Sequence, residues 1–218
     1  MDIFDHSKSL IENIYLISGP IIALLGFVAF SQLRLSKKVI ELTSKRQAAE
    51  LSAKQIEIYC NVIIPSQSKL SDGLIESKLE DVNINGLRQF TTQELLKKMN
   101  TGEILERSKF ISEKVTPILE VLNSMEAFST YFTKGVADEE IAFSSIGSTF
   151  CYSVNTYSFI YCILRDEKDE VLPFSNTIKL YEVWNSKLQT KKIKKELKQK
   201  TEELRKVEVE KINILGTK

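Results

Sequence analysis

The stretch "LISGPIIALLGFVAFSQLRLSKK", from Leu16 to Lys38, is a long apolar run that ends in a cluster of positive charge. Around it, the 21 residues from Asn13 to Leu33 carry no formal charge, and eleven of them are Leu, Ile, Val or Phe. An unbroken helix of that length reaches roughly 30 Å, the thickness of the hydrocarbon layer of a bilayer. The stretch therefore predicts a transmembrane helix over residues 13–33, with lipid as its surroundings.

Two other interpretations of this segment are weaker. A cleaved secretory signal begins with positive charge, has a shorter apolar stretch and ends in a small-residue cleavage site, whereas this chain begins "MDIFDHSKSLIE", with three acids and one Lys. A buried core helix of a soluble protein rarely lacks a polar stripe over 21 residues. We therefore expect the segment to remain in the mature protein.

The charges on either side of the segment predict its orientation. The positive residues crowd its C-terminal side, and the preceding residues are acidic. Because Lys and Arg resist translocation, we expect residues 1–12 to form a short extracytoplasmic tail and the rest of the chain to be cytoplasmic. The flanking positive residues are Arg34, Lys37, Lys38, Lys45 and Arg46.

Small residues recur within the predicted span. Gly19, Ala23 and Gly26 are spaced by four and by three, so they lie on one flank of a helix where two backbones can approach closely. This spacing favours association of spans and predicts a homo-oligomer. The alternative is that Gly and Ala are simply common in membrane helices.

The remainder predicts an all-α fold, because the chain has only eight Gly and four Pro and its apolar residues recur at helical spacing. A membrane-proximal helix over residues 34–65 continues from the span and ends near Pro65. Its apolar positions alternate by four and three, as in a coiled-coil seam. The seam positions, broken by the charged Arg46, are Leu35, Val39, Leu42, Arg46, Ala49, Ala53, Ile56, Cys60 and Ile63. Packing of this seam within its own bundle and pairing between subunits both remain open.

Residues 66–189 predict a cytoplasmic helical bundle. The expected helices are Ser68–Leu79, a short one from the capping-box sequence at Thr91 to Met99, one from Glu103 through Pro117 to Lys134, one capped by Asp138 and reaching Arg165, and a long last one capped by Ser175 or Asn176. Residues 80–90 read as a loop with a turn at Asn85-Gly86.

The 24 uncharged residues from Ile141 to Leu164 are a candidate second span. Two observations favour a helix inside the soluble bundle instead. Large apolar residues fall on one side of the helix and hydroxyl and amide residues on the other, and a second crossing would place the Lys-rich tail outside. The apolar side is Phe143, Ile146, Phe150, Val154, Tyr157, Tyr161 and Leu164; the polar side is Ser144, Ser145, Ser148, Asn155 and Thr156.

Residues 190–218 predict a basic C-terminal helix or tail. Seven Lys and one Glu occur between Lys187 and Lys200. Such a run is typical of a solvated helix face, and it also suits contact with an anionic inner leaflet or with a polyanionic partner. The residues singled out here are Lys191, Lys192, Lys194, Lys195 and Lys198.

The residue types of most catalytic sites are missing. The single histidine, His6, precedes the predicted span, and the chain has no P-loop, dinucleotide-binding glycine pattern or HExxH motif. The three cysteines, Cys60, Cys151 and Cys162, have no metal-binding spacing and suit a reducing compartment. We therefore expect no catalytic residues, no metal site and no cofactor, and hence no enzyme. A metal-dependent enzyme that uses carboxylates alone is the remaining alternative.

Several motifs in the second half stand together: "LNSMEAFSTYFTKGVADEE", an apolar helix ending in "YCILRDE", and "IKLYEVWNSKL". This pattern, from about Leu119 to Leu188, resembles a family of uncharacterised bacterial proteins with one N-terminal membrane helix and a small helical domain, found among phage-related and phage-defence genes. The matching positions are Asn123, Glu126, Gly135 to Glu140, Arg165, Tyr181 and Trp184.

The resemblance implies a membrane effector of bacterial immunity in the inner membrane. The implied mechanism is an oligomeric channel or another assembly that permeabilises the membrane under a cytoplasmic signal, made by a co-encoded enzyme. The alternative is a passive membrane tether that scaffolds a partner protein. No catalytic residues come with the resemblance.

The same positions allow two physical interpretations. Glu126 lies near the predicted core, so it needs a partner, and Arg165 is the candidate for a structural pair that locks two helices. If a nucleotide or oligonucleotide binds instead, Arg165 and Lys134 would meet its phosphates, and the aromatic residues would stack on its bases. These aromatic residues are Tyr157, Tyr181 and Trp184.

Overall fold

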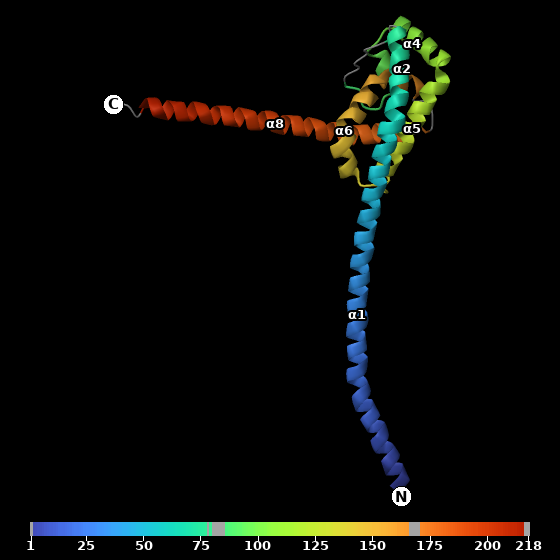
Figure 1. Cartoon of the computed structure of the whole chain (residues 1–218), viewed down its shortest axis with the longest axis vertical. Helices are drawn as coiled ribbons and strands as arrows, with labels where there is room; N and C mark the ends of the chain where they lie inside the picture. The colour runs from blue at the N-terminus through green and yellow to red at the C-terminus, as the bar shows by residue number, and fades with distance from the viewer. Residues whose placement is uncertain (1, 78, 80–85, 166–170, 216–218) are drawn as a thin grey trace. The chain divides into compact units, whose positions relative to one another are not determined.

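The computed structural model describes residues 2–77, 79, 86–165 and 171–215, with the side chains of 2–17 and 207–215 left aside. These residues are helical or lie in turns, and none of them forms a strand, which confirms the predicted all-α class. The elements in chain order (Figure 1) are α1 Asp2–Ile58, the π-helical turn η1 Tyr59–Ile63, α2 Ile64–Glu76, α3 Thr92–Leu96, α4 Thr101–Glu113, α5 Val115–Thr133, α6 Glu139–Thr156, α7 Ser158–Leu164 and α8 Ser175–Leu215.

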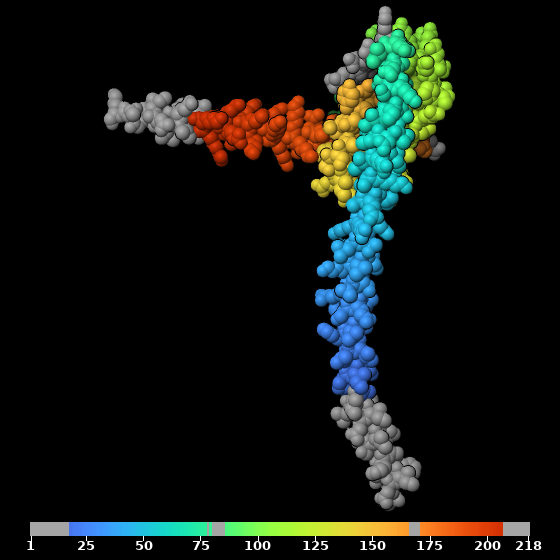
Figure 2. All heavy atoms as spheres, in the orientation of Figure 1, coloured from blue at the N-terminus to red at the C-terminus, as the bar shows by residue number. Residues whose placement is uncertain are grey.

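The chain divides into two compact units, Met1–Ala48 and Ala49–Lys218. The first unit contains α1 as far as Ala48, and residues 19–47 are exposed along their whole length (Figure 2). Among the described residues, one helix is long and apolar enough to cross a membrane, and it begins in this unit. From Asp2 the helix runs through Pro20 without a break, so it joins the described part of the predicted tail to the predicted span at 13–33 and to the start of the predicted membrane-proximal helix.

The second unit begins with the last residues of α1, and here the predicted end near Pro65 is wrong. Helical backbone continues through η1 and α2 to Glu76, so the predicted boundaries between residues 65 and 68 do not exist. Pro65 is tolerated because it lies in the first turn of α2, where a missing N–H costs little. Immediately before it, the Ile64 N–H donates to the Tyr59 carbonyl, the wider bond of a π-turn.

The buried face of this first helix of the unit differs from the predicted seam. Ala53 and Cys60, two of the seam positions, are exposed. Steps of four residues drift by about 40° on an α-helix, and the wider π-turn offsets that drift. The face that enters the core is Ser52, Gln55, Tyr59, Ile63, Gln67, Leu70 and Leu74.

The predicted helix from Glu103 to Lys134 is two helices, α4 and α5, separated at Lys114. Pro117 explains the break, because its ring would clash with the carbonyl of residue 113 in a continuous helix. Asn100 caps α4, because its Oδ1 accepts from the Glu103 nitrogen at 2.9 Å. The predicted loop over residues 80–90 lies largely outside the described residues; Gly86 has a φ of 82°.

The predicted helix from Asp138 to Arg165 starts as expected. Asp138 caps α6, because its Oδ1 accepts from the Glu140 and Ile141 nitrogens at 3.0 and 3.1 Å. The helix breaks at Tyr157 into α6 and α7, within an Asn-Thr-Tyr-Ser sequence of weak helix formers. All seven residues of the predicted apolar side are buried or half-buried, so α6 and α7 belong to the bundle core.

The first half of α8 passes through the centre of the core. Trp184 is fully buried, and its ring centroid lies 5.0 Å from that of Phe150, 5.9 Å from those of Phe132 and Phe143, and 6.3 Å from that of Phe128. The helices α5 and α6 supply these four rings. From residue 189 to residue 206, α8 is exposed.

Candidate functional site

The structure places most of the predicted ligand residues inside the core. Tyr157, Tyr181, Trp184 and Arg165 are all buried, while Lys134 is exposed at the end of α5. A base cannot stack on a ring that other side chains already cover. The structure therefore does not bring these five residues together around an open site, and it gives the four buried ones structural partners.

Arg165, which follows α7, holds two loops of the domain. Its Nε donates to the Gln89 carbonyl at 3.2 Å, and its Nη1 donates to the Pro173 carbonyl. Its own carbonyl accepts from the Thr92 nitrogen at 3.2 Å. Burial lowers the pKa of the guanidinium, but carbonyl partners and nearby acids keep it charged.

Each carbonyl that Arg165 holds precedes a strained residue. Phe90 has a φ of 54° and Phe174 a φ of 57°, a left-handed conformation that bulky residues rarely adopt. Both rings are buried, and both pack edge-on against Tyr161, with ring centroids 6.3 and 5.8 Å apart. Arg165 thus fixes two tight turns that send aromatic rings into the core, and this local strain is stabilised by its hydrogen bonds.

Glu126 does not form the predicted pair with Arg165. Its carboxylate caps the N-terminus of α8: Oε1 accepts from the Asn176 nitrogen at 3.1 Å, and Oε2 from the Thr177 nitrogen at 2.8 Å. The side chains of Asn176 and Thr177 donate to the same two oxygens at 2.8 and 2.9 Å. We expected a cationic residue to stabilise this carboxylate. The free N–H groups and the positive dipole end of a helix N-terminus stabilise it instead.

Replacing Glu126 with Ala removes both acceptor oxygens and all four hydrogen bonds. It should lower the free energy of unfolding by about 2–4 kcal/mol, since charged hydrogen bonds and helix caps each contribute about 1–3 kcal/mol. Glu120→Ala, at an exposed position of the same helix, is the matched control and should change it by less than about 0.5 kcal/mol. Urea unfolding followed by circular dichroism measures both. Equal midpoints for the two variants would contradict the capping role.

A second carboxylate, Glu139 at the start of α6, accepts from the Trp184 indole nitrogen and from the Lys187 ammonium. Tyr181 donates its hydroxyl to Asn155 Oδ1 at 2.7 Å. These bonds satisfy the indole nitrogen of Trp184 and the hydroxyl of Tyr181, two of the residues predicted to stack on bases. The same contacts lock α8 onto α6, which is a structural role.

Tyr157 belongs to a buried polar network between α2 and α6. Its hydroxyl donates to the Gln67 carbonyl at 2.8 Å, and Gln67 Oε1 accepts from the Ser153 hydroxyl at 2.9 Å. Tyr59 and Ser71 join at the two ends of this network. Burial raises the pKa of Tyr157, and it raises that of Tyr59 to about 12, so both hydroxyls stay neutral.

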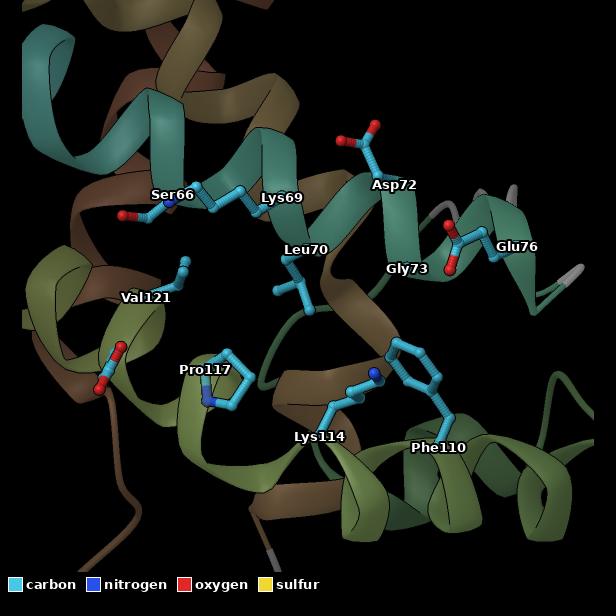
Figure 3. Close-up of a pocket in the computed structure, with 11 residues that line it drawn as sticks. Ser66, Lys69, Leu70, Asp72, Gly73, Glu76, Phe110, Lys114, Pro117 and Val121 are labelled. Atoms are coloured by element: carbon cyan, nitrogen blue, oxygen red, sulfur yellow. The ribbon is translucent and has the colours of Figure 1, made fainter.

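Two surface hollows lie among the described residues. The first, of about 320 Å³, lies between α2 and the corner of α4 and α5 (Figure 3). Its lining mixes Lys69 and Lys114 with three acids, so it has no clear charge preference. The second, of about 330 Å³, lies between α6 and α8 over Phe143, whose ring carries the ammonium groups of Lys187 and Lys191 at 5.1 and 4.5 Å.

The three cysteine thiols differ in exposure, and the remaining predicted residues lie on α1 and α8. Cys60 is exposed, while Cys151 and Cys162 are buried, and burial raises the pKa of each buried thiol to about 12. Within the described ranges, no three His, Cys, Asp or Glu side chains lie close enough together to hold a metal ion. Gly19, Ala23 and Gly26 are exposed on α1, and the five singled-out lysines of the basic tail are exposed on α8. The side chain of His6 lies outside the description.

Comparisons with known proteins add no relative: no family model, no curated protein and no solved structure matches the chain. The resemblance to phage-defence membrane proteins therefore stays a prediction from the sequence motifs.

Proposed function

We propose that the chain is a non-catalytic membrane protein in which residues 13–33 anchor a helical domain at the membrane surface. The observation that carries this proposal is the exposed apolar surface of α1: Ile22, Leu24 and Phe27 have 67 to 73 % of their surface exposed. A continuous apolar surface of that length is unstable in water, and a bilayer would cover it. The positive residues after Leu33 favour a cytoplasmic domain of a bacterial inner-membrane protein.

The second unit suits a tether or scaffold. Several of its buried polar side chains bond within the domain, as Gln67 and Ser153 do, and its aromatic residues fill the core. Its exposed faces are therefore what a partner protein would bind. Exposed apolar residues on those faces include Val62, Ile75 and Leu105.

A second candidate is the membrane effector that permeabilises the inner membrane during phage infection. The observation that favours it is the open flank of α1, because nothing lies within 4 Å of a Cβ added at Gly19 or Gly26. Close approach of several spans at this flank would build a pore-forming oligomer. The controlling nucleotide or oligonucleotide signal and its co-encoded enzyme belong to this candidate alone.

Membrane partitioning tests the anchor. The full chain should stay with membranes after alkaline extraction and leave them with detergent. Leu24→Arg with Leu25→Arg, at the centre of the span, should reduce the membrane-bound share strongly, since each central Arg costs roughly 2.5–3.5 kcal/mol. Ser36→Arg, just outside the span, is the control and should leave it unchanged. A wild-type chain released by alkali would contradict the proposal.

Ion leakage distinguishes the two candidates. Liposomes that contain the purified full chain should hold a potassium gradient if the protein is a tether, and should lose it if the protein is a channel or permeabilising assembly.

A further inference from the structure

An apolar stripe continues along α1 beyond the predicted span. Leu35, Val39 and Leu42 have 66, 55 and 59 % of their surface exposed. They follow or alternate with Arg34, Lys37 and Lys38, which place this part of the helix outside the hydrocarbon layer of the proposed membrane. Lipid tails therefore cannot cover Val39 and Leu42, and no described residue of the same chain covers them.

The stripe has the register of a two-stranded coiled coil. Leu35 and Leu42 fall on d positions and Val39 on an a position, the arrangement that favours parallel pairs. The same alternation by four and three extends back through the span to Ile21. The complete register is Ile21, Leu25, Val28, Gln32, Leu35, Val39, Leu42 and Arg46, with the two polar residues at a positions. A polar residue at an a position is a device that fixes register.

The small-residue flank lies on the other side of this helix. At 100° per residue, the mean direction of Gly19, Ala23 and Gly26 differs from that of the stripe by roughly 160°. One straight two-helix contact cannot use both faces. A single pair of helices therefore uses one face or the other, and the stripe is the one that continues into water.

We propose that a second copy of this chain covers the stripe, so that two α1 helices form a parallel coiled coil through residues 21–46. The inference rests on the proposed membrane anchoring, which makes the two helices parallel. Charge favours this pairing: Lys45 and Glu50 are five residues apart on flanking positions, where a Lys of one helix meets a Glu of the other. In the single helix Lys45 lies 3.1 Å from Glu41, an exposed pair that the interchain bridge would replace.

Cysteine crosslinking in membranes tests this pairing. In the full chain with Cys60→Ser, the remaining thiols are buried. Val39→Cys and Leu42→Cys place single thiols on the stripe, and Lys37→Cys and Ser44→Cys place them on the small-residue side; all four positions are exposed. After oxidation with copper phenanthroline, the disulfide-linked dimer should be roughly tenfold more abundant at 39 and 42, because a disulfide needs Cα atoms within about 7 Å.

Each other outcome overturns the pairing. If more disulfide-linked dimer forms at 37 and 44, the contact lies on the small-residue face. If dimer is equally abundant or absent at all four positions, no second copy covers the stripe. The anchor is scored separately: a chain found in the soluble fraction overturns the anchoring, and the same four-position comparison there still decides the coiled coil.

Discussion

Trp184→Ala should lower the free energy of unfolding of the helical domain by about 3–5 kcal/mol, the usual cost of removing a fully buried large aromatic residue. The indole contacts rings from α5 and α6, and its nitrogen bonds to Glu139. Truncation leaves a cavity and removes one of the two hydrogen bonds to the Glu139 carboxylate, which keeps its bond from Lys187. Because Trp184 is the single tryptophan, far-ultraviolet circular dichroism of the detergent-solubilised full chain during urea unfolding is the suitable measurement.

Val183→Ala is the matched control for this change, because the neighbouring side chain is 43 % exposed. It should shift the free energy of unfolding by less than about 1 kcal/mol. If Trp184→Ala unfolded at the same urea concentration as Val183→Ala, the ring would not be part of the core. This result would favour the predicted role of Trp184 in stacking on a nucleotide base.

Arg165→Met should destabilise the domain by about 3–5 kcal/mol. The substitution leaves the Gln89 and Pro173 carbonyls without their donor in a buried place, and each charged hydrogen bond contributes about 1.5–3 kcal/mol. It also releases the two turns at Phe90 and Phe174. Arg165→Lys should recover only part of the loss, because one ammonium lacks the planar fork that reaches both carbonyls. Thermal unfolding of the full chain measures all variants.

Lys134→Met is the control, because Lys134 is exposed and shared the predicted phosphate role. It should leave the unfolding temperature unchanged. Suppose instead that Lys134→Met and Arg165→Met both change stability only slightly and both abolish nucleotide binding. This result would support the ligand site and contradict the structural role of Arg165.

Local sequence signals predicted the parts of the fold that depend on neighbouring residues. Asp138 caps its helix as its position before two acids suggested. The apolar side of α6 and α7 is buried because 3.6-residue periodicity reports which face meets the core. The break at Lys114 also follows from a local signal, because the Pro117 ring would clash with the carbonyl of residue 113 in a continuous helix.

The partners of Glu126 and Arg165 depend on parts of the chain that are distant in sequence. Backbone groups satisfy both: Glu126 meets the nitrogens of Asn176 and Thr177, and Arg165 meets the carbonyls of Gln89 and Pro173. Backbone groups occur at every residue, so no residue type marks them in a sequence. The prediction paired Glu126 with Arg165 because their charges are opposite, whereas the fold uses the two residues in separate places.

The π-turn at Tyr59–Ile63 has a consequence for insertions and deletions. Such a turn holds one residue more than a regular turn while the helix on each side keeps its own face toward the core. Shortening it by one residue at the exposed Asn61 or Val62 would give back a regular helix with both faces retained. Deleting one residue eight positions earlier, at Ala53, would rotate every side chain between that position and the π-turn by about 100°. Residues that are now exposed would then face the core. The tolerance of this helix to changes in length is therefore concentrated in a single turn.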